Sequence, residues 1–160
     1  MSATFDSTGR MRRPPASSTA ISKTMRATKS RDTGPEVALR KALWAAGHRG
    51  YRTNYKNLPG KPDIVYTKKR VALLIHGCFW HGCSKCSNFR PPKANANFWA
   101  SKLSETRLRD NAAEIALAQL GYTVLTIWEC EVRRELQRVL RFVSSHLIAD
   151  GAAQPRSESD

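Results

Sequence analysis

One short segment in the middle of the chain constrains the fold more than any other. Between Ile75 and Cys86 lie three of the four cysteines, two of the four histidines and two aromatic residues. Thiolates at Cys78, Cys83 and Cys86 can supply three soft ligands of a tetrahedral zinc site. The remaining cysteine, Cys130, can complete it. The segment therefore predicts a zinc site that links two distant parts of the chain.

His81, which lies between Cys78 and Cys83, is not needed as a fifth ligand. An imidazole held beside a rigid metal site is well placed to act as a general base. The alternative for the cysteines is burial as free thiols, which suits one or two of them but not three crowded next to a histidine. The N-terminus lacks the apolar core of a signal peptide, so we expect a cytosolic protein with reduced thiols. Reduced thiols favour a metal over two disulfides.

The charge of the chain points to a polyanionic partner. Lysine and arginine number 27 against 13 acidic residues, a formal net charge of +14. Nucleic acid is the leading candidate. An anionic membrane fits less well, because neither a basic amphipathic helix with a large apolar face nor a membrane-spanning run stands out. Charge alone does not separate a DNA enzyme from a chromatin-like binder.

Periodicity and turn residues predict one α/β domain: a helix, three strands, a helix, a strand and a helix. The first helix starts at Thr33 with Glu36 in a capping box, and Val71 to Ile75 reads as a strand buried on both faces. We expect a three-layer α/β/α sandwich around a small mixed sheet. The predicted parts are a disordered basic arm (1–22), the folded domain (23–149) and a polar tail (150–160). The predicted apolar stripes are Val37, Leu39, Leu43 and Trp44 in the first helix, and Leu103, Ala112, Ile115, Gln119 and Leu120 in the long helix.

An acid at the entrance of one predicted strand is a candidate metal ligand. Pro62 and Asp63 open a strand whose partner ends near His76, and an acid in that position is typical of PD-(D/E)xK nucleases, which bind Mg²⁺. The alternative is an ordinary turn residue. The second strand lacks the D/E-x-K pattern, so this signal is weak by itself.

Five motifs taken together resemble the very short patch repair (Vsr) DNA mismatch endonucleases. They are Leu58–Asp63, His76–Cys83, Phe98-Trp99, Arg109-Asp110 and Trp128-Glu129-Cys130. The resemblance implies a PD-(D/E)xK-type fold with a structural zinc site. It also implies a Mg²⁺-dependent enzyme that nicks one strand 5′ to the thymine of a T:G mismatch, the product of 5-methylcytosine deamination. Two alternatives stay open: a nuclease of wider or different specificity, and a zinc-stapled DNA-binding protein without cleavage.

The resemblance implies a role for each residue of the active site. Asp63 matches the principal Mg²⁺ carboxylate, and Ile75 matches a position whose main-chain carbonyl contacts the metal. His81 matches the histidine that activates water, and His76 a second active-site histidine. Glu36 matches a glutamate that reaches metal-bound waters, although a capping role alone would explain it.

Further positions match the zinc site and the DNA contacts. Cys78, Cys83, Cys86 and Cys130 match an all-sulfur, closed and therefore structural zinc site. Phe79, Trp80 and Trp99 resemble a wedge that enters the DNA stack, for which the alternative is core packing. The other implied DNA contacts are Met25 from the opposite groove, Lys102 at the mismatched pair, and Thr106, where the family commonly has asparagine. Asp110 lies in the matching Arg109-Asp110 motif, and an ion pair on the helix surface would explain it equally well.

The implied partner is double-stranded DNA with a T:G mismatch. We expect a monomer that does not bind membranes, is cytoplasmic and associates with the nucleoid. Accessory mismatch-repair proteins are further expected partners.

Overall fold

The computed structural model describes residues 31–87, 89–90 and 93–149. The predicted arm (1–22), the polar tail (150–160) and Met25 lie outside the described residues. Three helices and four strands follow in the predicted order: α2 (Gly34–Ala45), β1 (Arg52–Thr53), β2 (Ile64–Tyr66), β3 (Val71–His76), α3 (Ala96–Gln119), β4 (Thr123–Trp128) and α4 (Glu129–Ala149).

The strands form one small mixed sheet in the order β1-β2-β3-β4. Neighbours β1/β2 and β2/β3 are antiparallel, whereas β3 and β4 are parallel, with His76 opposite Trp128. Because parallel strands end at the same edge of a sheet, the loop after His76 and the helix after Trp128 leave that edge side by side. This topology brings Cys78 close to Cys130.

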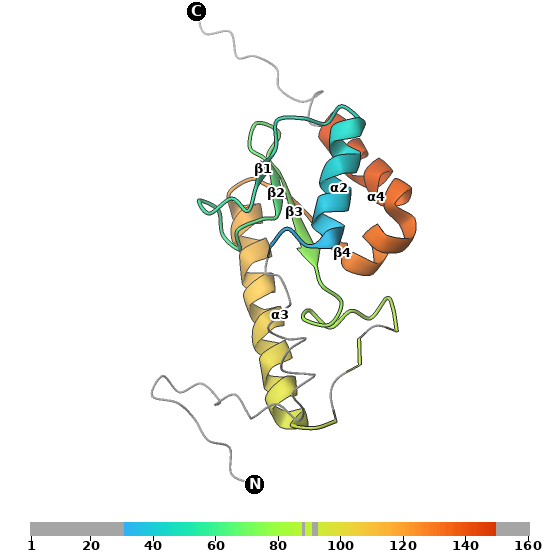
Figure 1. Cartoon of the computed structure of the whole chain (residues 1–160). Coiled ribbons are helices and arrows are strands. Elements are labelled where there is room, and N and C mark those ends of the chain that lie inside the picture. The colour runs from blue at the N-terminus through green and yellow to red at the C-terminus, as the bar shows by residue number, and fades with distance from the viewer. Residues whose placement is uncertain (1–30, 88, 91–92, 150–160) are drawn as a thin grey trace, which may run out of the picture.

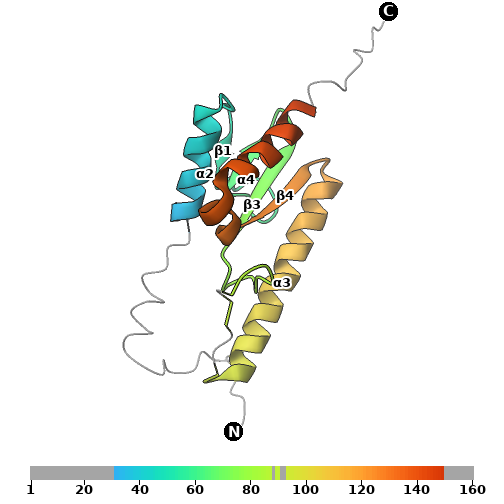
Figure 2. The same ribbon diagram turned by 90° about the vertical axis from the view of Figure 1, so that its right-hand side faces the viewer.

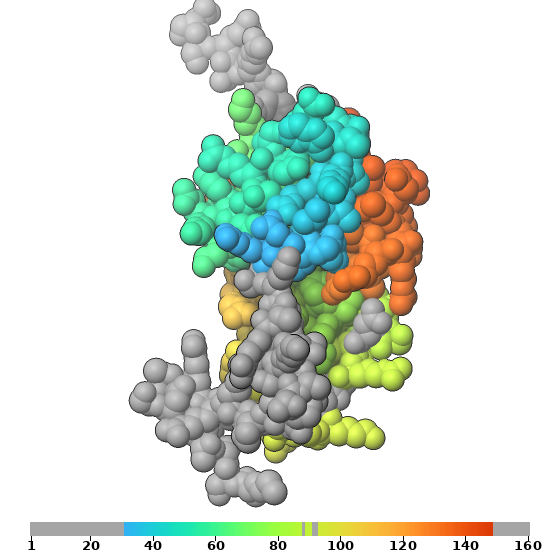
Figure 3. Space-filling model, in the orientation of Figure 1, coloured from blue at the N-terminus to red at the C-terminus, as the bar shows by residue number. Residues whose placement is uncertain are grey.

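Helices cover both faces of the sheet, as Figures 1 and 2 show. Helices α2 and α4 lie on one face, and in the space-filling view their side chains form one continuous surface (Figure 3). Their core includes Leu43, Leu73 and Val143, all fully buried. Helix α3 lies on the other face, where Leu117 packs with Ala72 of β3. The predicted α/β architecture with a small mixed sheet is therefore confirmed.

Two details of the predicted burial were wrong. The apolar run from Tyr122 to Trp128 predicts a buried strand, but β4 lies at the edge of the sheet and buries only Leu125 and Ile127, whereas β3 at the centre has five of its six residues buried. Trp44 was placed in the core stripe of α2 but is 52% exposed, with the guanidinium of Arg49 4.7 Å from its ring centre. A cation over the ring lets a large aromatic side chain remain at the surface.

The buried stripe of α3 also differs from the prediction. Ile115 and Leu120, expected inside, are about half exposed. Leu103 is buried as predicted, and the other side chains that face the protein are Thr106 and Leu117, with Asp110 partly buried between them. A stripe that contains a threonine and a carboxylate has weak apolar periodicity, which is why the pattern did not reveal it. No helix in the described part of the chain combines the length and apolar character needed to cross a bilayer.

Candidate active site and zinc site

A cleft of about 1270 Å³ opens at the ends of β2 and β3 and is bordered by α2, α3 and α4. All five residues assigned by sequence to catalysis line this cleft: Glu36, Asp63, Ile75, His76 and His81. They come from the start of α2, the entrance of β2, the end of β3 and the loop that follows. The structure therefore brings together side chains that lie up to 45 positions apart in the sequence.

Asp63 is fixed to the neighbouring strand by a hydrogen bond. The Ile75 N–H donates to Asp63 Oδ2 at 2.7 Å, and the Asp63 N–H donates to the Leu73 carbonyl at 3.1 Å. Burial raises the pKa of Asp63 to about 6; the Ile75 N–H opposes that rise and the nearby charge of Glu36 adds to it. A carboxylate whose charge is costly in this way favours binding of a cation.

Glu36 is buried and is held at the start of α2. Its two oxygens accept one hydrogen bond each, from the Thr33 hydroxyl and from the Asp32 N–H, both at 2.8 Å. The predicted capping box is therefore replaced by a different arrangement, because the Thr33 hydroxyl donates to the glutamate and does not cap the helix N–H groups. Glu36 both orders the helix start and places a negative charge near Asp63.

His81 forms a close pair with Asp110 of α3. Nδ1 of His81 lies 2.5 Å from Asp110 Oδ2, and both side chains are about one-fifth exposed. The ring of His76 stacks on that of His81 with centroids 4.0 Å apart. Burial, together with the adjacent His81, lowers the pKa of His76 to about 4. His76 is therefore neutral near pH 7.

Asp110 was not assigned to the active site from the sequence, where a surface ion pair seemed equally plausible. The structure instead directs its carboxylate toward His81. The spacing of α3 could have indicated this role. Leu103, Thr106, Asp110 and Leu117 follow one face of the helix, and a carboxylate on the face that points inward needs a partner.

The four cysteines converge as predicted. Their sulfur atoms all lie within 4.8 Å of one another, and the sulfurs of Cys83 and Cys130 are 3.9 Å apart. A tetrahedral site with Zn–S bonds of about 2.3 Å has sulfur–sulfur edges of about 3.8 Å. Burial raises the pKa of the Cys78 and Cys130 thiols, so that a bound cation is needed to keep them as thiolates. These residues fit zinc.

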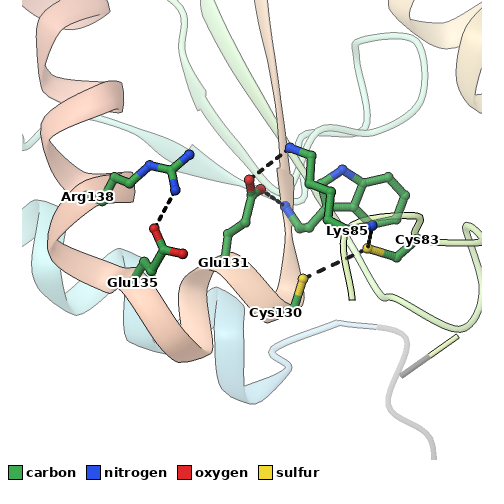
Figure 4. A network of polar contacts seen from close by, with 7 residues as sticks. Cys83, Lys85, Cys130, Glu131, Glu135 and Arg138 are labelled. Atoms are coloured by element: carbon green, nitrogen blue, oxygen red, sulfur yellow. Dashed lines mark hydrogen bonds and ion pairs between the residues drawn. The ribbon is translucent and has the colours of Figure 1, made fainter. Parts of the chain in front are cut away.

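Polar contacts brace this cluster from the side of α4 (Figure 4). The Lys85 N–H donates to Cys83 Sγ at 3.4 Å, and the Lys85 ammonium pairs with Glu131 at 2.8 Å. Glu131 also accepts the Trp128 N–H at 2.9 Å, which caps the start of α4. The cysteine loop is thus tied to α4 by side chains as well as by sulfur.

Three aromatic residues assigned to the DNA wedge form one cluster. The ring of Phe79 lies 5.1 Å from that of Trp80 and 5.5 Å from that of Trp99. None of the three is fully buried, and Trp80 also lines the cleft. The cluster therefore borders the candidate active site, and its rings remain partly open to solvent.

The remaining predicted DNA contacts differ in exposure. Lys102 is exposed at the surface of α3, where its ammonium lies 3.9 Å from Glu105. Thr106 is only 7% exposed, and its hydroxyl donates to the Lys102 carbonyl at 2.9 Å. In this conformation the Thr106 hydroxyl is engaged inside the protein, which does not support its prediction as a reader of the base pair.

Comparison with known proteins gives a consistent result. Residues 17–87 match the family DNA mismatch endonuclease Vsr. The chain is 42% identical over 108 residues to the type II nicking enzyme V.XorIIP of Xanthomonas oryzae pv. oryzae, covering 68% of this chain and 78% of the relative. It is 42% identical over 118 residues to the type II nicking enzyme V.NmeAIP of Neisseria meningitidis (70% and 83%). It is 38% identical over 112 residues to the DNA mismatch endonuclease Vsr of Escherichia coli (70% of each).

Proposed function

The chain belongs to the Vsr family of DNA mismatch endonucleases, and we propose that it is a Mg²⁺-dependent enzyme that nicks one strand 5′ to the thymine of a T:G mismatch. The observation that carries this proposal is the convergence of Asp63, His81 and Asp110 in one cleft with an aromatic cluster at its border. A DNA-binding protein without cleavage would not require a buried carboxylate and a paired histidine in the same cleft. The proposed catalytic domain spans residues 23–149.

The strand arrangement supports a PD-(D/E)xK-type fold. An acid enters one strand of an antiparallel pair, and its carboxylate is bonded to the N–H of Ile75 at the end of the partner strand. Helices cover both faces of the sheet. The lysine expected in the second strand is absent, since β3 ends at Ile75 and His76.

The proposed general base is His81. Because an ionised carboxylate only accepts hydrogen bonds, Asp110 selects the tautomer of His81 with its proton on Nδ1. The second nitrogen, Nε2, is then free to take a proton from water. Asp110 also stabilises the imidazolium that results. His76 remains neutral beside it and therefore adds no repelling charge when His81 becomes protonated.

The proposed Mg²⁺ ligands are the Asp63 carboxylate and the main-chain carbonyl of Ile75, and Glu36 is the proposed contact to water that Mg²⁺ would hold. Bound Mg²⁺ would polarise the scissile phosphate and neutralise developing charge. The residues fit this ion, because Mg²⁺ prefers oxygen ligands and the charge of the buried Asp63 carboxylate is poorly solvated. The ionised form of Asp63 is required in this role.

Recognition is proposed to rest on the wedge of Phe79, Trp80 and Trp99. Partly exposed rings can replace base stacking that is lost when the duplex opens, and a mismatched step costs less to open than a paired one. Lys102, exposed on the same helix as Trp99, is the proposed contact to the mismatched pair. Thr106 is left out of the proposed DNA surface because its hydroxyl is bonded internally.

The proposed zinc at Cys78, Cys83, Cys86 and Cys130 is structural. Four sulfur ligands close the coordination shell, which leaves no position for water or substrate. The site holds the loop that carries His81 against the first turn of α4.

A nicking assay tests the function directly. Duplexes that carry each of the possible mismatches, and a matched duplex, are incubated with the protein with and without Mg²⁺. We expect a single nick 5′ to the thymine of the T:G duplex, only with Mg²⁺, and no nick from Asp63→Ala at equal DNA occupancy. Nicking that is equal on matched and mismatched duplex would contradict the specificity, and nicking by Asp63→Ala would contradict the site.

A further inference from the structure

The cleft contains cations that the catalytic assignment does not use. Its lining includes four carboxylates, Glu36, Asp63, Asp110 and Glu129, and three cations, Lys61, Arg109 and Arg133. DNA carries one negative charge per phosphate, so a cleft rich in carboxylates repels the strand wherever no cation compensates. At least one phosphate of the strand therefore needs a cationic contact beside the metal ligands.

Arg133 is the cleft cation whose position is fixed by an ion pair in the described residues. Its Nε and Nη2 lie 2.9 and 2.7 Å from Oε1 of Glu129. A guanidinium has five N–H groups, and these two contacts use two of them. The side chain is 60% exposed, so the remaining N–H groups are accessible. A planar fork of this kind matches two oxygens of a phosphate.

Glu129 is in turn fixed to the cysteine loop. Its Oε2 accepts the N–H of Cys78 at 3.3 Å. One carboxylate thus bonds both to the backbone of a proposed zinc ligand and to an arginine in the cleft. An ordinary i, i+4 pair on a helix surface would have only the second of these contacts.

We propose that Arg133 binds a non-scissile backbone phosphate of the strand that is cut, and that Glu129 is its positioning residue. The path from the Cys78 N–H through Glu129 to Arg133 links the cysteine site to the placement of the DNA strand. This inference rests on the proposed function for the identity of the strand, but it predicts a binding contact that is measurable without cleavage.

The test couples a protein substitution to the removal of one DNA charge. Affinity for a T:G duplex is measured without Mg²⁺ for wild type, Arg133→Ala and Arg134→Ala, with a neutral methylphosphonate placed at each backbone position in turn. Arg134 is the matched control: it is the adjacent exposed arginine and is not among the described residues that line the cleft. Zinc content and thermal unfolding of each variant verify that it is folded.

For Arg133→Ala we expect binding to weaken severalfold and the salt slope to fall by about one. At one phosphate, the methylphosphonate should weaken DNA binding by wild type and by Arg134→Ala but leave binding by Arg133→Ala unchanged. We call this loss of the methylphosphonate effect the coupling between Arg133 and that phosphate. If the losses of affinity from Arg133→Ala and from the methylphosphonate add at every phosphate, the proposed contact is wrong. Glu129→Gln should reduce this coupling although it removes a negative charge, and full coupling in that variant would overturn the positioning role of Glu129.

The nicking assay separates the two conclusions. If wild type fails to nick the T:G duplex while Arg133 still couples to one phosphate, the proposed function is wrong and the phosphate contact stands. If wild type nicks and Asp63→Asn does not, yet no phosphate couples to Arg133, the function stands and this inference is wrong.

Discussion

Replacing Asp63 with asparagine should abolish nicking and at the same time stabilise the protein in buffer without Mg²⁺. Asparagine retains an oxygen that can accept the Ile75 N–H, which bonds to Asp63 at 2.7 Å, but it carries no charge. The ionised carboxylate is costly in the folded state, because burial, with a smaller contribution from Glu36, raises its pKa from 3.8 to about 6. An active-site ligand of this kind trades stability for function.

The size and sign of the effect follow from proton linkage. Since the folded protein holds this proton more tightly than the unfolded chain, stability is lost as pH rises from about 4 to about 6, and the loss is complete above that range. A shift of about 2 pKa units corresponds to at most about 3 kcal/mol at pH 7.5, falling to about 1 kcal/mol at pH 4.5. Asp63→Asn should remove this penalty and therefore gain most at the higher pH.

Urea unfolding at both pH values measures the difference. Glu105→Gln is the control, because Glu105 is an exposed acid on α3 whose loss should change stability little at either pH. Added Mg²⁺ should stabilise wild type and not Asp63→Asn. A gain for Asp63→Asn that is the same at pH 4.5 and 7.5, or no gain at all, would refute the electrostatic reasoning.

Three further predictions concern the base, the zinc and the wedge. His81→Ala should slow single-turnover nicking by about two to four orders of magnitude, and Asp110→Asn should slow it less. DNA binding should be retained in both variants. Near wild-type rates would show that His81 and Asp110 do not act in the mechanism. Cys130→Ala should lose its zinc by elemental analysis and unfold at lower temperature, and fully active protein without zinc would contradict the structural assignment. Trp80→Ala and Trp99→Ala should each weaken binding to mismatched duplex by about 1–3 kcal/mol, with a much smaller loss on matched duplex. Equal losses on both duplexes would indicate that the rings serve only in packing.

The sequence predicted best those features that depend on neighbouring residues. The strand predicted from Val71 to Ile75 was evident from its unbroken apolar run, and the cysteine cluster because cysteines at 78, 83 and 86 are crowded into nine positions. The fourth cysteine of the cluster, Cys130, followed by elimination, and the parallel pairing of β3 with β4 explains how it comes close to the other three. Such signals survive without tertiary information.

Features that depend on contacts between layers were harder to predict. The partner of Asp110 is 29 positions away, and nothing in the local pattern of α3 indicates a histidine across the cleft. The sequence does not distinguish Arg133 from the other arginines, because its pair with Glu129 and its place at the cleft arise from the fold. The predicted stripe of α2 has the spacing of a helix face, but Trp44 lies outside the part of that face that is buried. Of the predicted stripe, Leu39 and Leu43 reach the core.

One loop carries both the proposed zinc ligands and the proposed general base, and its geometry explains why. Cys78 and Cys83 are joined by a 2.9 Å hydrogen bond from the Cys83 N–H to the Cys78 carbonyl, so the segment between them is a compact turn. Within that turn Phe79 and Trp80 form part of the aromatic cluster, while His81 reaches Asp110. A turn this short has no core of its own, and the proposed zinc would supply its order. Zinc bound at its two ends would therefore fix the base and the wedge in one step, and loss of the metal should disturb nicking and mismatch binding together.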